Sequence, residues 1–184
     1  MSGLYVLKSL SAAEEYIKVK GDISNIKLPI RKSETQYLNK EKIELGILES
    51  GGLEIPDVIY YESIFLISNR LKQLFDTVGI DYVFWKPADI HSEQFGIHET
   101  FWIIVPQRID CLDIDNSIFD SEWDFQDGLV PMLNIEKIAV LSKNIGNFQI
   151  FKILGITDNN IYITQELFEK ISLGDFKGID FLKL

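Results

Sequence analysis

The chain has 184 residues, of which 46% are hydrophobic and 12% aromatic, and its formal net charge at pH 7 is −10. This hydrophobicity excludes an intrinsically disordered chain, and the acidic balance argues against a nucleic-acid-binding protein, which needs a basic surface. The single cysteine, Cys111, excludes an internal disulfide and a zinc site built from several cysteines. The length predicts one domain over residues 1–184, with residues 1–52 as a separate N-terminal lobe as the alternative.

Signals for export or membrane insertion do not stand out in the sequence. Residues 1–8 lack the basic start and the long apolar run of a secretory signal peptide. No apolar run approaches the ~20 residues that are needed to cross a bilayer. We therefore expect a cytoplasmic protein without a membrane partner.

Short apolar runs that are separated by turn residues predict strands along most of the chain. Residues 26–30 contain Pro29, which cannot donate a backbone hydrogen bond, so this run is expected to form at most an edge strand. Residues 12–19 fit a helix or a strand. The clearest strands are predicted at residues 4–7, 43–48, 100–105, 138–141 and 148–153.

Two segments predict amphipathic helices of similar design. In the first, an apolar strand runs into Ser68, whose hydroxyl can cap a helix, and Gly79 ends that helix. In the second, Thr164 takes the capping position and Gly174 follows the helix. The apolar stripes are Leu71, Leu74, Phe75 and Val78 in the first helix and Leu167, Phe168 and Ile171 in the second.

Each predicted helix is followed by another strand, at residues 81–86 and 178–183, so a strand–cap–helix–strand unit occurs twice. Ser68 aligns with Thr164 at an offset of 96 residues, and Leu71 aligns with Leu167. Strands predominate without a regular alternation of strand and helix. The predicted fold class is therefore α+β, a mainly antiparallel sheet with two amphipathic helices.

A search for catalytic and metal-binding patterns finds no convincing site. His91 and His98 are the only histidines, and we interpret them as loop residues because neither has a ligand at the short spacings of metal sites. Cys111 lies between Asp110 and Asp113, which would raise the pKa of its thiol and disfavour a nucleophile, so we expect it to be a buried core residue. No catalytic, cofactor-binding or metal-binding residues are predicted.

The acidic charge is concentrated in one segment. Residues 108–137 contain eight acidic and only two basic side chains. Within it, aromatic residues alternate with carboxylates, which is typical of binding hot spots and also of a strand with one face buried. As a hypothesis, this segment binds a partner through Asp120, Glu122, Trp123, Asp124 and Asp127.

The order of several short motifs is familiar. These are Pro56-Asp57, the run Leu66-Ile-Ser-Asn-Arg-Leu-Lys72, the run Asp110-Cys-Leu-Asp113, the run Tyr162-Ile-Thr-Gln-Glu-Leu167 and finally Gly178-Ile-Asp-Phe181. In this order they resemble bacterial immunity-protein family eleven of polymorphic toxin systems, formerly a domain of unknown function, over residues 53–184. Asn69 departs from the pattern, where an acidic residue is expected.

The resemblance implies a non-catalytic cytoplasmic protein that binds a cognate toxin domain and blocks it, without cofactors. The net charge suggests a basic toxin domain as the partner. Two alternatives remain open at this point. One is a small thiol-dependent hydrolase that uses Cys111, and the other is an adaptor module of a secretion system.

Overall fold

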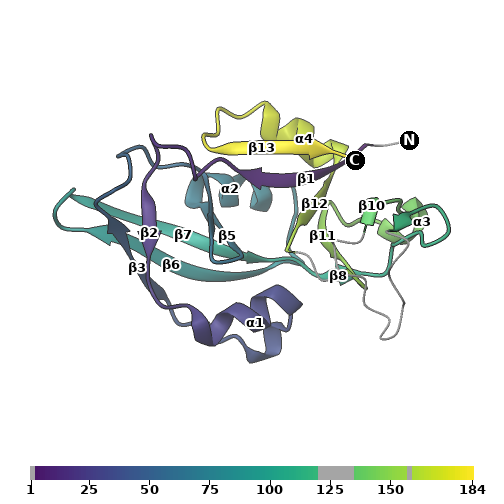
Figure 1. Ribbon diagram of the computed structural model, residues 1–184, viewed down its shortest axis with the longest axis horizontal. Helices are drawn as coiled ribbons and strands as arrows, with labels where there is room; N and C mark the ends of the chain where they lie inside the picture. The colour runs from purple at the N-terminus through teal and green to yellow at the C-terminus, as the bar shows by residue number, and fades with distance from the viewer. Residues whose placement is uncertain (1–2, 120–134, 157–158) are drawn as a thin grey trace.

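The computed structural model describes residues 3–119, 135–156 and 159–184. Its larger sheet has six strands in the order β2-β3-β6-β7-β5-β4 (Figure 1). These strands are β2 (Lys18–Lys20), β3 (Ile43–Leu48), β6 (Phe84–Ser92), β7 (Ile97–Val105), β5 (Ile64–Ser68) and β4 (Val58–Tyr61).

A second sheet has five strands in the order β13-β1-β12-β11-β8, and a two-stranded ribbon joins β9 to β10. The strands of the second sheet are β13 (Ile179–Lys183), β1 (Leu4–Ser9), β12 (Ile161–Thr164), β11 (Ile150–Ile153) and β8 (Arg108–Ile109). The ribbon consists of β9 (Ile118–Phe119) and β10 (Ile135–Lys137). The helices are α1 (Ser24–Lys32), α2 (Asn69–Thr77), α3 (Ser142–Ile145) and α4 (Gln165–Ser172), with a 3₁₀ turn at Thr35–Tyr37.

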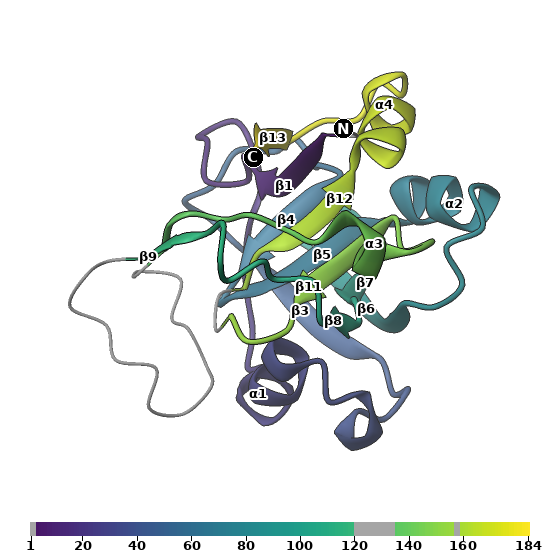
Figure 2. The same ribbon diagram turned by 90° about the vertical axis from the view of Figure 1, so that its right-hand side faces the viewer.

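The predicted α+β class is confirmed, and the pairing of strands is mostly antiparallel. The exceptions are the parallel pairs β3–β6 and β8–β11. Figure 2 shows α2 and α4 together on one side of the molecule and α1 on another. The described residues form three apolar clusters: one between the larger sheet and α1, one beneath α2 and α4, and one against β8, β11 and the segment around Cys111.

The twofold unit seen in the sequence recurs in the fold. The unit β5–α2–β6 places its two strands on either side of β7, and the unit β12–α4–β13 places its two strands on either side of β1. In both units the central strand is antiparallel to its neighbours. Leu71 and Phe75 of α2 and Leu167 and Ile171 of α4 are buried in the same apolar cluster. The two units therefore pack against a shared core.

Both predicted caps are confirmed. Ser68 Oγ accepts a hydrogen bond from the backbone N–H of Leu71 at 3.1 Å, and Thr164 Oγ1 accepts one from that of Leu167 at 3.5 Å. Gly79, which follows α2, has a φ of +82°, as expected for the residue that ends a helix. The Ser68 hydroxyl has a second role, because it also donates to Oδ1 of Asp57.

The two caps should therefore differ in their contribution to stability. We expect Thr164→Ala to lower the free energy of unfolding by about 1 kcal/mol, the usual cost of a lost cap. Ser68→Ala should cost about 2 kcal/mol, because it also leaves a buried carboxylate oxygen of Asp57 short of a donor. Urea unfolding of both variants checks this difference. Equal losses would mean that the bond from Ser68 to Asp57 contributes nothing to stability.

The prediction of an edge strand at residues 26–30 is wrong, because this run lies in α1 with Pro29 inside the helix. Ile23, Ile26 and Ile30 recur at helical spacing and are buried against the larger sheet. The end of the helix is also held from the other sheet: the ammonium of Lys152 donates to the carbonyls of Ile30 and Arg31 at 3.1 and 3.3 Å. These tertiary contacts outweigh the backbone hydrogen bond that Pro29 cannot make.

The strand predicted at residues 138–141 is also wrong. The β10 strand ends at Lys137, and beyond it only an isolated bridge joins Val140 to Leu112. Ile138 and Val140 instead pack as single side chains against the cluster around Cys111. The strands predicted near residues 4–7, 43–48, 100–105 and 148–153 are all present within a few residues of their predicted bounds.

Residues 1–52 supply inner strands to both sheets. The β1 strand lies between β13 and β12, and β3 lies between β2 and β6. A buried lysine also ties this region to the rest of the chain: Lys86 of β6 donates to the backbone carbonyls of Asn39 and Glu41 and to the Asn39 side chain. Burial lowers the pKa of Lys86, and three acceptors compensate its ammonium.

Candidate functional site

The partner-binding residues predicted from the sequence cannot be placed. Asp120, Glu122, Trp123, Asp124 and Asp127 lie outside the described residues. Just before them, Asp113 is tied into its own loop, where its carboxylate accepts hydrogen bonds from the backbone and side chain of Asn116. The described segment also exposes apolar surface at Ile114 and Ile118.

Cys111 lies in the core, where its exposed fraction is 0%. Burial, with a smaller effect from Asp110, raises the pKa of the thiol to about 11. The thiol is therefore protonated at neutral pH and closed to substrates, and it cannot act as a nucleophile. Leu112 packs in the same cluster as Cys111, and the chain here is irregular rather than a strand.

We expect the Cys111 thiol to resist modification in the folded protein. A disulfide reagent at pH 8 should react with it only as fast as the protein opens, and within seconds once guanidinium chloride has unfolded the chain. The matched control is a variant with Cys111→Ala and a cysteine at the exposed position Ala12, which should react at once without denaturant. Equally rapid reaction of native Cys111 would contradict its burial.

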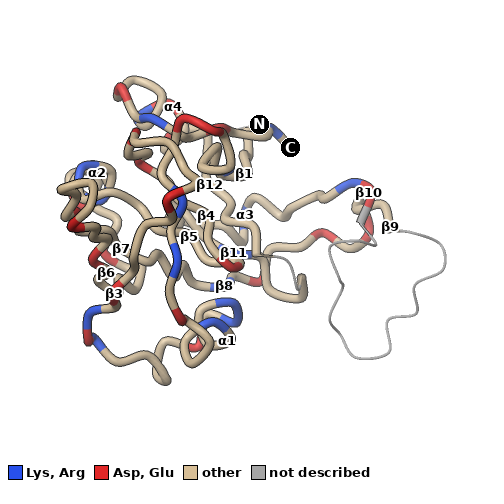
Figure 3. The backbone as a smooth tube through the Cα atoms, turned by 60° about the vertical axis from the view of Figure 1, so that its left-hand side comes forward, with Lys and Arg blue, Asp and Glu red and all other residues tan. Residues whose placement is uncertain are grey.

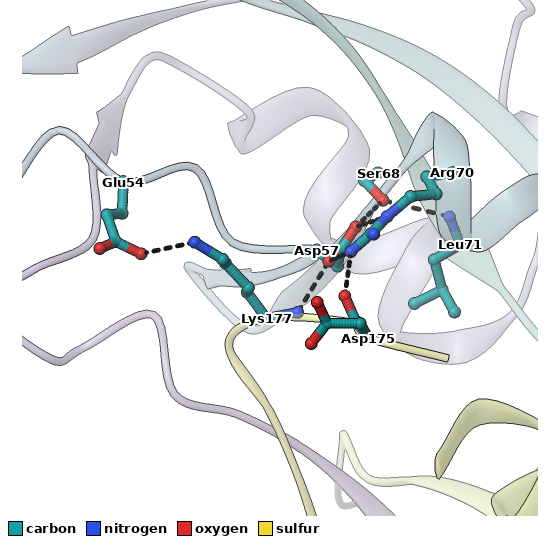
Figure 4. A network of polar contacts seen from close by, with 7 residues as sticks. All are labelled: Glu54, Asp57, Ser68, Arg70, Leu71, Asp175 and Lys177. Carbon is teal, nitrogen blue, oxygen red and sulfur yellow. Dashed lines mark hydrogen bonds and ion pairs between the residues drawn. The ribbon is translucent and has the colours of Figure 1, made fainter. Parts of the chain in front are cut away.

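The carboxylate of Asp57, which is 6% exposed, accepts four hydrogen bonds (Figure 4). Its Oδ1 accepts from the Ser68 hydroxyl and from Arg70 Nε at 3.3 Å. Its Oδ2 accepts from Arg70 Nη2 at 2.6 Å and from the backbone N–H of Lys177 at 2.8 Å. We call this group, consisting of Asp57, Ser68, Arg70 and Lys177, the Asp57 junction.

The Asp57 junction joins three parts of the chain. The backbone N–H of Asp57 donates to the Lys177 carbonyl, and the N–H of Ser68 donates to the Asp57 carbonyl, both at 2.8 Å. Arg70 also donates to the carbonyl of Asp175 at 2.6 Å and lies 4.7 Å from the ring centre of Phe176. The start of β4, the start of α2 and the loop between α4 and β13 are thus fixed to one carboxylate.

The chemistry of the junction is that of a structural group. The hydrogen bond from Arg70 to Asp57 raises the pKa of Arg70, so the guanidinium stays charged. Each carboxylate oxygen already accepts two hydrogen bonds, whereas a general base needs a free lone pair within reach of a substrate proton. The junction is therefore built to hold the fold together.

Three of the five motifs that carry the family resemblance meet at this junction or directly beside it. Asp57, Ser68 and Arg70 belong to two of them, and Gly178 belongs to a third. Gly178 has a φ of +70°, and a Cβ placed there would come 2.4 Å from the Cβ of Pro56. Glycine is thus required beside Pro56, both for its backbone conformation and for space. These motifs specify the fold and do not by themselves locate a binding surface.

The two histidines are not loop residues, as the sequence suggested, but lie directly opposite each other on β6 and β7. His91 Nδ1 lies 3.4 Å from Glu44 Oε2, and His98 Nε2 lies 3.5 Å from Asp89 Oδ2. Asp89 also accepts hydrogen bonds from Lys42 at 2.6 Å and Thr100 at 3.0 Å. The hydrogen bond from Lys42 lowers the pKa of Asp89, so this carboxyl is ionised at neutral pH.

The two histidines, Glu44 and Asp89 border a hollow of about 520 Å³, which we call the hairpin hollow. It lies on β3, β6 and β7, near the turn that ends the β6–β7 hairpin. Sequence reasoning missed it because the turn at Gly96 hid the pairing of the strands. The available signal was the period-two spacing of Asp89 and His91 before the turn and of His98 and Thr100 after it. The lining residues are Glu44, Asp89, His91, Ser92, Glu93, Gly96, Ile97 and His98.

An aromatic pair lies further along the same face. The Lys72 ammonium of α2 is 5.5 Å from the ring centre of Trp85 and 5.0 Å from that of Trp102. Asn69, the position where the family pattern was expected to be acidic, accepts a hydrogen bond from Trp102 Nε1 at 3.1 Å. Helix α2 therefore covers the two tryptophans and leaves the hairpin hollow uncovered.

Neither a metal site nor a membrane span emerges from the part of the chain that the structure describes. Within it, no three His, Cys, Asp or Glu side chains are grouped closely enough to hold a metal ion. No helix among the described residues is long and apolar enough to cross a membrane.

The comparison with known families gives one match. The family described as Immunity protein family (Imm11) matches residues 13–184, which include every motif of the resemblance and nearly the whole chain. This family is generally non-catalytic, in agreement with the prediction that the protein is not an enzyme. No curated protein matches the sequence.

Proposed function

Because the chain belongs to the Imm11 immunity protein family, we propose that it binds a cognate toxin domain and neutralises it by covering its active surface. It would act in the cytoplasm of the cell that makes the toxin. The family match over residues 13–184 carries this proposal. Two further observations support it. Both oxygens of the Asp57 carboxylate are already hydrogen-bonded, and the Cys111 thiol is buried, so neither group is available for catalysis.

The toxin domain that we propose as partner is basic. The net charge of −10 gives the protein a field that attracts a positive surface and repels nucleic acid. From the sequence, the acidic segment with Asp120, Glu122, Trp123, Asp124 and Asp127 remains a proposed binding segment. Electrostatic attraction of this kind mainly raises the association rate and weakens as salt is added.

The alternatives differ in what they predict. The thiol hydrolase is disfavoured because Cys111 is buried with a raised pKa, and Cys111→Ala should leave neutralisation intact. An adaptor of a secretion system would bind a component of that apparatus and no toxin. A complex of the purified protein with such a component, but not with a toxin domain, would support the adaptor alternative.

The experiment uses the protein encoded by the open reading frame next to this gene as the candidate toxin domain, purified in an inactive form. We expect a one-to-one complex in size-exclusion chromatography with light scattering. The association rate of the two proteins should decrease as the NaCl concentration is raised from 50 to 500 mM. Absence of a complex at micromolar concentrations of both proteins would overturn the proposal.

A further inference from the structure

The β6–β7 hairpin presents an uncovered sheet face at one end of the molecule. In Figure 1 the hairpin reaches the left end, while β10 lies at the right end. Side chains of β6 and β7 alternate between two faces. Ala88, Ile90 and Phe101 point into the cluster beneath α1, so Asp89, His91, His98 and Thr100 share the opposite face with Trp102.

On that opposite face the hairpin hollow is open to solvent. The exposed fractions of the side chains of Glu44, His91 and His98 are 63%, 51% and 74%. The side chain of Asp89 is only 7% exposed and forms part of the floor, where Lys42, Thr100 and His98 hold it in one position. The hollow thus combines a fixed anionic floor with exposed polar walls.

The charge of the hollow is not balanced by the lysines around it. Lys42 is paired with Asp89. Among the described residues, neither Glu44 nor Glu93 forms an ion pair with a lysine or arginine. Glu44 lies instead within 3.4 Å of His91. Figure 3 shows the acidic residues beside β3, β6 and β7. One further cation, Lys20, lies across Gly46 at the margin of this face.

We propose that the hairpin hollow is a contact site for the toxin domain and receives a basic loop of it, with a lysine or arginine side chain directed toward Glu44 and Glu93. This inference rests on the proposed function. The volume of the hairpin hollow, about 520 Å³, is ample for one lysine or arginine side chain and its flanking backbone.

The test measures association and dissociation rates with the inactive toxin domain of the neighbouring open reading frame at 50 and 500 mM NaCl. Glu44→Lys and Glu93→Lys should each lower the association rate about fivefold or more at low salt, and less at high salt. Lys20→Glu should raise the association rate, because it removes a positive charge near the hollow. The matched control is Asp81→Lys, which makes the same charge change at an exposed site near the other end of β6.

The outcomes separate the two proposals. If the wild-type protein does not bind the toxin domain, the proposed function fails. If it binds but Glu44→Lys, Glu93→Lys and Asp81→Lys all behave alike, only the assignment of the hollow fails. A loss of binding confined to a variant with Asp120, Glu122, Asp124 and Asp127 all changed to Lys would place the interface in that segment instead. Circular dichroism confirms that each variant is folded.

Discussion

Asp57→Ala is expected to lower the free energy of unfolding by about 3 kcal/mol or more. The substitution removes an acceptor of four hydrogen bonds from a nearly buried position and leaves the Arg70 guanidinium and the Lys177 N–H without their partner. Asp57→Asn should be almost as destabilising, because the amide NH₂ of asparagine would face the hydrogen-bond donors that now bind a carboxylate oxygen. Urea denaturation, followed by circular dichroism, measures both losses.

A surface carboxylate provides the control for Asp57. Asp76 pairs with Lys72 one turn away on α2, and its side chain is 52% exposed. Asp76→Ala should cost less than about 0.5 kcal/mol, the usual range for such a pair. If Asp57→Ala were no more destabilising than Asp76→Ala, the Asp57 junction would not hold the fold together.

Removal of the first strand is expected to prevent folding. A chain of residues 13–184 keeps the whole family match but lacks β1, so β12 and β13 lose the strand that lies between them. A chain of residues 53–184 additionally loses β3 from the other sheet. We therefore propose that residues 1–184 form a single domain, and we expect both shortened chains to be unfolded in circular dichroism and amide NMR spectra.

Two point variants in β1 provide a finer measurement. Leu7 is 0% exposed, and Leu7→Ala should cost about 2–5 kcal/mol, as expected for a core leucine. Lys8, its neighbour on the opposite face, bonds to Asn160, and Lys8→Ala should cost less than about 1 kcal/mol. A folded, cooperative chain of residues 53–184 would instead support a separate N-terminal lobe.

The caps and helices could be predicted from sequence because their signals are local. Ser68 and Thr164 precede apolar stripes at helical spacing, and the same residues form each helix and its cap. Helix α1 could not be predicted this way. Pro29 disfavours it locally, and what stabilises its end comes from Arg108 and Lys152, over 75 residues away along the chain.

The candidate site was harder to predict for the same reason. The hairpin hollow depends on the parallel pairing of β3 with β6, which brings Glu44 beside Asp89 across more than 40 residues of sequence. Charge counting pointed to residues 108–137, where carboxylates are dense along the chain, whereas the hollow gathers its charges from separate strands. The number of carboxylates in a stretch of sequence therefore does not predict how many carboxylates lie together on the folded surface.

Survival of cells that are exposed to the toxin tests whether this protein neutralises it. Cells that express the active toxin domain of the neighbouring open reading frame are plated with and without this protein. We expect the wild-type protein and Cys111→Ala both to restore growth to the level of cells without toxin. Continued killing in the presence of an excess of folded wild-type protein would contradict it.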